Sequence, residues 1–144
     1  MKKGRVLFLC TENACRSQIA EAIINASPSR GWQAYSAGMQ PAAAVHPMVS
    51  KVLAESGIPF HGKPKSARAF EGKPFDLIIT LCDPSEQECP LWLGPGQRLH
   101  HGYPDPGRMQ GTEAEKLAAF RKLRDDMMTE LPYLLERNGR GKMA

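Results

Sequence analysis

The residues that most constrain the fold are 5–26, where a short apolar run leads into a polar turn and then into an amphipathic segment. Residues 5–9 have the length and the continuous apolar character of a buried strand. After the turn, apolar residues return at helical spacing, at Ile19, Ala22, Ile23 and Ala26. The pattern predicts a strand, a tight loop and a helix, with residues 10–17 at the N-terminus of that helix.

A loop in this position is suited to bind a tetrahedral oxyanion, because its backbone N–H groups lack helical partners and carry the positive end of the helix dipole. Cys10 begins the loop, and the dipole together with Arg16 favours the thiolate form of its side chain. Arg16 offers a planar fork for two anion oxygens, and the Ser17 hydroxyl can donate to the sulfur. We interpret Cys10 as a nucleophile beneath an anion-binding cradle, and not as a buried small residue near a surface arginine. The cradle comprises Thr11, Glu12, Asn13, Ala14, Cys15, Arg16 and Ser17.

The bulk properties indicate one domain over residues 1–144, since this length supports one hydrophobic core and is short for two. No apolar run approaches the ~18 residues of a membrane helix, and the N-terminus has no cleavage pattern of a signal peptide. We therefore expect a cytoplasmic protein that does not bind membranes. The net charge of +4 is diffuse, so it favours anionic ligands and gives little support to nucleic-acid binding.

The rest of the chain predicts an α/β fold, a three-layer sandwich with a four-stranded parallel sheet flanked by helices. Strands are predicted at 5–9, 32–37, 75–81 and 97–101, and helices after residue 17, at 48–56, 66–70 and 84–88, and from 113 onward. The last helix begins with a capping box at residues 112–115, and we expect Pro132 to kink it or restart its last turn. Its inward residues are predicted to be Leu117, Phe120, Leu123, Met127, Leu131 and Leu134.

Four cysteines in a cytoplasmic chain favour reactive thiols over structural disulfides. The spacings of Cys10 with Cys15 and of Cys82 with Cys89 do not match zinc sites, and we expect neither a metal nor a cofactor. His100 and His101 are interpreted as the end of a strand. Because ligands bind at the carboxyl ends of strands in open α/β sheets, Cys82 is predicted to lie at the same edge as Cys10.

These motifs resemble the low-molecular-weight protein tyrosine phosphatase superfamily, whose phosphate loop is Cys-x5-Arg-Ser/Thr at the end of the first strand. Asp105, in the sequence Tyr-Pro-Asp-Pro, matches the family's general acid. Residues 79–82 (Ile-Thr-Leu-Cys), followed by Cys89 and a proline, resemble the thioredoxin-coupled arsenate reductases of this superfamily. Residues 36–38 and 124–125 also match, so the resemblance spans essentially the whole chain.

The resemblance implies a catalytic set of Cys10, Arg16, Cys82, Cys89 and Asp105. Cys10 would attack arsenate while Asp105 protonates the departing oxygen, and Cys82 would then attack Cys10 to release arsenite. Cys89 would resolve that disulfide for reduction by thioredoxin, although glutaredoxin-linked relatives leave the reductant open. We expect a monomer for which phosphate and sulfate compete with arsenate. Two alternatives stay open. The protein could be a phosphatase in which Cys82 and Cys89 serve only as a redox guard for Cys10, or it could be a non-catalytic phosphate-binding or redox-sensing module.

A disulfide between residues 82 and 89 requires a change of backbone. Seven helical residues span ~10.5 Å, whereas the α-carbons of a disulfide lie roughly 4.4–6.8 Å apart. We therefore expect oxidation to unwind the short helix at 84–88, which lacks apolar side chains and is bounded by prolines.

Within the loop, Asn13 is expected in a left-handed conformation and Cys15 in a structural role. Glu12 departs from the glycine that is common in the family, and its carboxylate would oppose anions unless it turns to solvent. Glu21 and Ser36 match positions that bind potassium in some relatives. A lysine of residues 63–66 could supply that charge here.

Overall fold

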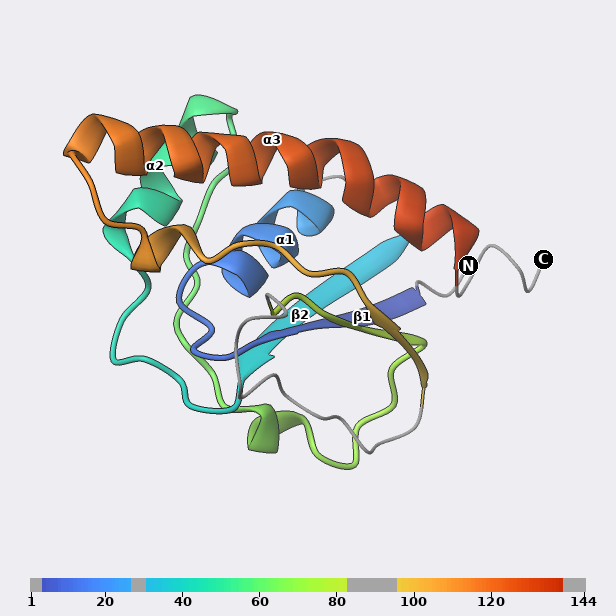
Figure 1. Ribbon diagram of the computed structural model, residues 1–144. Coiled ribbons are helices and arrows are strands. Elements are labelled where there is room, and N and C mark those ends of the chain that lie inside the picture. The colour runs from blue at the N-terminus through green and yellow to red at the C-terminus, as the bar shows by residue number, and fades with distance from the viewer. Residues whose placement is uncertain (1–3, 27–30, 83–95, 139–144) are drawn as a thin grey trace.

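A computed structural model describes residues 4–26, 31–82 and 96–138, and it contains the predicted four-stranded parallel sheet (Figure 1). The strand order is β2-β1-β3-β4. The central strand β1 pairs with β2 over seven residues and with β3 over four. The strands are β1 (Gly4–Cys10), β2 (Trp32–Gly38), β3 (Leu77–Thr80) and β4 (Gln97–His100).

The two faces of the sheet are covered differently. Alternate β1 residues point to opposite faces, so Val6 and Phe8 belong to one apolar cluster and Leu7 and Leu9 to another. The first cluster packs against three helices, which lie on one side of the sheet in Figure 1. The second contains Phe70 of the short 3₁₀ helix η2. The helices are α1 (Arg16–Asn25), α2 (Pro47–Glu55), η2 (Ala67–Phe70), η3 (Pro106–Arg108) and α3 (Glu113–Arg137).

Helix α3 confirms the predicted capping box, and its C-terminal half contains Pro132 and a buried leucine that the sequence did not predict. The Thr112 side chain accepts from the Glu115 backbone, and the Glu115 side chain accepts from the Thr112 backbone. Pro132 lies inside the helix, which continues to Arg137. The proline removes only the bond to the carbonyl of residue 128, an exposed position where water can replace it. The innermost residue of this turn is Leu135, whereas Leu134 is partly buried.

Several boundaries differ from the predicted ranges. Strand β3 is shorter than the predicted range 75–81. The backbone N–H groups of Asp76, just before β3, and of Leu81, just after it, still donate to carbonyls of β1. Strand β4 ends at His100, one residue earlier than predicted. The helix predicted at 84–88 lies outside the described residues.

The sheet topology determines where a ligand can bind. The chain passes from β1 to β2 on one side, and returns to place β3 on the other side of β1. In sheets of this kind the carboxyl ends of the strands at the point of reversal form a crevice for ligands. Here that crevice lies beyond the end of β1. Within the described ranges, no helix has the length and apolar character needed to cross a membrane.

Candidate active site

Residues 10–16 join β1 to α1 and form the loop that the sequence predicts to bind an oxyanion, here called the phosphate loop. Asn13 has a φ of 53°, as expected, which makes it the single described non-glycine residue with positive φ. The loop therefore turns sharply at Asn13 and leads into the first turn of α1 with no side-chain cap. Uncapped N–H groups at a helix N-terminus are available to an anion.

The nucleophile candidate Cys10 is 2% exposed and contacts a serine hydroxyl. Its Sγ lies 2.8 Å from the Oγ of Ser17, and the Asn13 amide nitrogen donates to the same Oγ at 2.6 Å. Because the amide nitrogen can only donate, the Ser17 hydroxyl keeps its own proton available for Cys10. The Ser17 hydroxyl is therefore placed to donate to the Cys10 sulfur.

Asn13 is the centre of a buried network that supports one side of the loop. Its Oδ1 accepts from the Gln18 amide at 2.9 Å and from the Lys65 backbone N–H at 2.8 Å. Gln18 also donates to the carbonyl of Lys63 at 2.8 Å. Gly38 lies against the loop so closely that an added Cβ would be 2.7 Å from the Thr11 carbonyl oxygen. The loop is thus held by side-chain amides and by close backbone packing.

The Lys65 side chain lies against Glu21 and Ser36. Its Nζ is 3.5 Å from the Glu21 Oε1 and 3.4 Å from the Ser36 Oγ. The Ser36 hydroxyl donates to the same Glu21 oxygen. A potassium ion does not fit these residues, because an ammonium group already balances the Glu21 carboxylate. The lysine expected from residues 63–66 is therefore Lys65.

Arg16 supports the other side of the loop and is 2% exposed. Its Nη1 donates to the carbonyl of Tyr103 at 3.1 Å and lies 3.4 Å from the carbonyl of Leu81. Its Nη2 is 3.5 Å from the Oδ2 of Asp105. Two backbone carbonyls from separate segments therefore set the orientation of the guanidinium plane.

Asp105 lies at the start of η3, in the segment that passes beside α3 in Figure 1. Its Oδ1 accepts from the Gly107 N–H at 2.9 Å, and its Oδ2 faces Arg16 and also Arg108 at 3.5 Å. The side chain is 13% exposed, so it borders both the loop and solvent. The structure thus brings together Cys10, Arg16 and Asp105.

Cys82 is fully buried just beyond the end of β3. The β1–β3 register pairs Leu9 with Thr80, and the Leu81 N–H donates to the Leu9 carbonyl at 2.8 Å. Cys10 ends β1 and Cys82 follows β3, so the two residues lie at the carboxyl ends of neighbouring strands, at the same edge of the sheet. Cys89 lies outside the described residues.

Two other loop positions, Glu12 and Cys15, differ in exposure. Glu12 is exposed, and its carbonyl accepts from the Ala42 N–H at 3.0 Å. The Glu12 side chain is therefore accessible to solvent. Cys15 is 6% exposed and packs in the core, and burial raises the pKa of its thiol well above the usual range, with the negative charge of Asp105 adding to that effect.

The two histidines near the end of β4 make ordinary structural contacts. The His100 Nδ1 lies 2.7 Å from the Thr80 Oγ1 on the neighbouring strand. The His101 Nε2 lies 3.0 Å from the Glu130 Oε1 on α3. The first contact agrees with the interpretation of these residues as a strand end.

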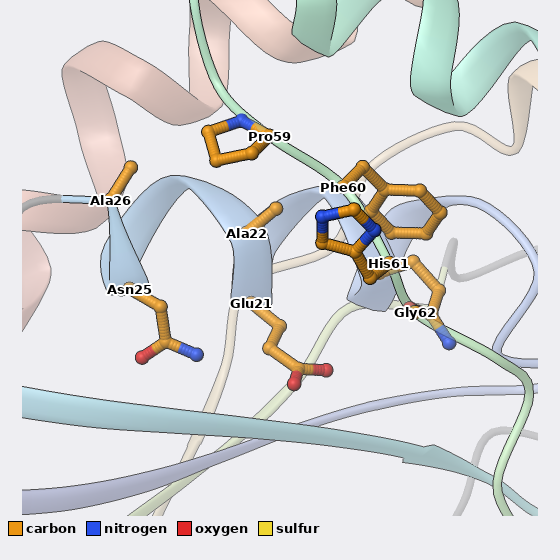
Figure 2. A pocket seen from close by; sticks show the side chains of 9 residues that line it. Glu21, Ala22, Asn25, Ala26, Pro59, Phe60, His61 and Gly62 are labelled. Carbon is orange, nitrogen blue, oxygen red and sulfur yellow. The ribbon is translucent and has the colours of Figure 1, made fainter.

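A separate cavity of about 340 Å³ lies between α1 and residues 59–62 (Figure 2). Glu21 points away from His61 in this view, toward the strand below α1. The cavity shares Gln18 and Glu21 with the support of the loop, but its lining does not include Cys10. It is therefore distinct from the anion-binding crevice.

The arrangement can bind a tetrahedral oxyanion and attack it with a thiolate, with a carboxyl group beside the leaving oxygen. The sequence did not predict several residues that hold the loop in place. These supporting residues are Gln18, Gly38, Leu81 and Tyr103. Gly38 was predicted only as the end of a strand. Leu81 and Tyr103 contact Arg16 through backbone carbonyls, which every residue type has, so the sequence could not indicate them.

Residues 5–142 match the low molecular weight phosphotyrosine protein phosphatase family. An arsenate reductase of Halalkalibacterium halodurans is 37% identical over 128 residues, which are 88% of this chain and 91% of that protein. The crystal structure of an arsenate reductase from Archaeoglobus fulgidus has a TM-score of 0.66 at 31% identity, and the match covers 89% of this chain and 98% of that one. A thioredoxin-dependent arsenate reductase of Corynebacterium glutamicum has a TM-score of 0.62 at 25% identity, over 93% and 63% of the respective chains.

Proposed function

The chain belongs to the low molecular weight phosphotyrosine protein phosphatase family, and within it we propose that the protein reduces arsenate to arsenite. The observation that carries this proposal is the burial of Cys82 at the same sheet edge as Cys10. Hydrolysis of a phosphate ester needs no second thiol there. Reduction of arsenate needs two electrons, which two thiols supply by forming a disulfide.

In the first step the phosphate loop and Arg16 bind arsenate, and the Cys10 thiolate forms a bond to arsenic. Asp105 protonates the departing oxygen, which leaves as water. Cys82 then attacks the Cys10 sulfur, the S–As bond breaks, and its electron pair stays on arsenic. Arsenite leaves, and a Cys10–Cys82 disulfide holds the two oxidising equivalents.

Recycling of the enzyme requires a third thiol and an external reductant. Cys89 attacks Cys82, frees Cys10 and forms a Cys82–Cys89 disulfide, which thioredoxin reduces by exchange. The thioredoxin-dependent Corynebacterium glutamicum relative supports this choice of reductant. We propose that the protein is a cytoplasmic monomer and that phosphate and sulfate compete with arsenate for the loop.

Phosphatase activity is the second candidate, because Cys10, Arg16 and Asp105 also suit ester hydrolysis and the family name refers to that reaction. The two reactions differ in their need for Cys82. We would measure arsenate-dependent NADPH oxidation with thioredoxin and thioredoxin reductase, and p-nitrophenyl phosphate hydrolysis in parallel, in wild type, Cys10→Ser and Cys82→Ser.

We expect Cys10→Ser to abolish both activities and Cys82→Ser to abolish only arsenate turnover. The remaining ester hydrolysis by Cys82→Ser would show that the loop is intact. Repeated arsenate turnover by Cys82→Ser would overturn the proposed disulfide sequence. Mass mapping after one turnover would then identify which thiols pair.

A further inference from the structure

Glu130 on α3 is bonded to two residues of the segment that leads to Asp105. The Tyr103 hydroxyl donates to the Glu130 Oε1 at 2.7 Å, and the His101 Nε2 lies 3.0 Å from the same oxygen. The His101 and Tyr103 rings meet edge to face, with centroids 5.1 Å apart. Tyr103 is 5% exposed, so its ring is held by the core as well as by this bond.

The same tyrosine contacts the anion-binding arginine through its backbone. The Tyr103 carbonyl accepts from Arg16 at 3.1 Å, and its N–H donates to the Leu81 carbonyl at 3.0 Å. Asp105 follows two residues later and faces Arg16. Tyr103 therefore connects α3, through Glu130, with both Arg16 and Asp105.

This part of the molecule needs an additional anchor. Strand β4 has four residues, of which three are exposed, and among the described residues it pairs with β3 alone. The segment after it passes beside α3 with no regular structure until η3 (Figure 1). A short, exposed edge strand by itself constrains the following backbone weakly.

We propose that Glu130, acting through Tyr103 with His101 beside it, is a positioning residue for Arg16 and Asp105. The bond to the tyrosine hydroxyl fixes the ring, and the ring fixes the direction of the carbonyl that orients the Arg16 guanidinium. An arginine binds a tetrahedral anion through two parallel bonds only if its plane is aligned beforehand. The inference rests on the proposed function for its effect on turnover, but its effect on anion binding does not require that function.

The test compares Tyr103→Phe, which removes only the hydroxyl, with Glu130→Ala and Glu130→Gln. The probe is inorganic phosphate, and its Kd is measured by isothermal titration calorimetry. The matched control is Glu55→Ala, because Glu55 also connects a neighbouring helix to α3, through Arg121 and Arg124. Thermal unfolding is recorded for every variant.

We expect Tyr103→Phe and Glu130→Ala each to weaken phosphate binding about fivefold, as for the loss of one hydrogen bond. The double variant should be no worse than Glu130→Ala, because both changes break one connection. Glu130→Gln, which keeps an acceptor oxygen, should recover part of the affinity. Glu55→Ala should lower the Tm and leave the Kd for phosphate unchanged.

The kinetic readout then separates this inference from the proposed function. The kcat/KM for p-nitrophenyl phosphate should fall by the same factor as phosphate affinity, whether or not the protein reduces arsenate. A phosphate Kd within twofold of wild type in Tyr103→Phe and Glu130→Ala, with a lowered Tm, would overturn the positioning role. Absence of arsenate turnover with these shifts in Kd would instead contradict only the proposed function.

Discussion

The Asn13 side and the Arg16 side of the phosphate loop are supported by different means. On the Asn13 side, a fully buried amide accepts from Gln18 and from the Lys65 backbone, and β2 packs directly against the loop. On the Arg16 side, the contacts reach backbone carbonyls that follow two shorter strands, β3 and β4.

The difference indicates a division of tasks. The Asn13 side keeps the N–H groups aimed at one point, and it is built from the long paired strands β1 and β2. The Arg16 side carries Cys82, the residue that must move in the proposed reaction, and Asp105, its proposed proton donor. A rigid cradle beside a more adjustable edge suits a reaction in which the anion stays in place while thiols exchange.

The largest effect should follow from Asn13→Ala, which removes the amide network and places a Cβ residue without a local polar partner at φ 53°. We expect kcat/KM to fall ~100-fold for both arsenate and p-nitrophenyl phosphate, comparable to the loss of one oxyanion donor. Asn13→Gly tolerates the backbone conformation but lacks the amide. Full activity in Asn13→Gly would show that the amide bonds do not support the loop.

Two glycine substitutions compare the two sides directly. A Cβ at residue 38 would lie 2.7 Å from the Thr11 carbonyl oxygen, and one at residue 102 would lie 2.6 Å from the Cys82 carbonyl oxygen. We expect Gly38→Ala to cost ~3 kcal/mol of unfolding free energy and Gly102→Ala ~1 kcal/mol, because the second backbone can shift more easily. Urea denaturation measures both, and equal costs would contradict the difference in rigidity.

Lys65→Met should have a smaller effect, because its ion pair with Glu21 is partly exposed and such pairs contribute little. We expect kcat/KM for p-nitrophenyl phosphate to fall about threefold, since Glu21 keeps only its bond from Ser36. Lys51→Met on α2 is exposed and serves as a control for the loss of one positive charge. An equal decrease in both variants would indicate a general charge effect.

The smallest effect on the loop is expected from Glu55, which lies on α2 and accepts from Arg121 and Arg124. The hydrogen bond from Arg121 is the largest cause that lowers the pKa of Glu55 from 4.5 to about 2. A lowered pKa stabilises the folded state above the unfolded value and loses that effect as the pH falls. The Tm difference between wild type and Glu55→Gln should therefore be constant above pH 4.5 and shrink toward pH 2, with unchanged phosphate binding.

The parts of the molecule that the sequence predicted are those with a local signature. The strand, loop and helix of residues 5–26, the left-handed Asn13 and the capping box of α3 each depend on residue types at fixed spacing. The supports of Arg16 could not be found in this way, because any residue can supply a carbonyl oxygen. The burial of Leu135 beside the predicted Leu134 likewise depends on how the end of α3 lies on the core.

The peptide group between residues 81 and 82 has a further consequence for the timing of product release. Its oxygen is an acceptor for Arg16, and its nitrogen belongs to Cys82. A rotation of this peptide that carried the second sulfur toward the first would also turn that oxygen away from the guanidinium. In the proposed reaction, Arg16 would then bind the oxyanion more weakly at the same time as the S–S bond forms. Arsenite would therefore leave as the enzyme becomes oxidised.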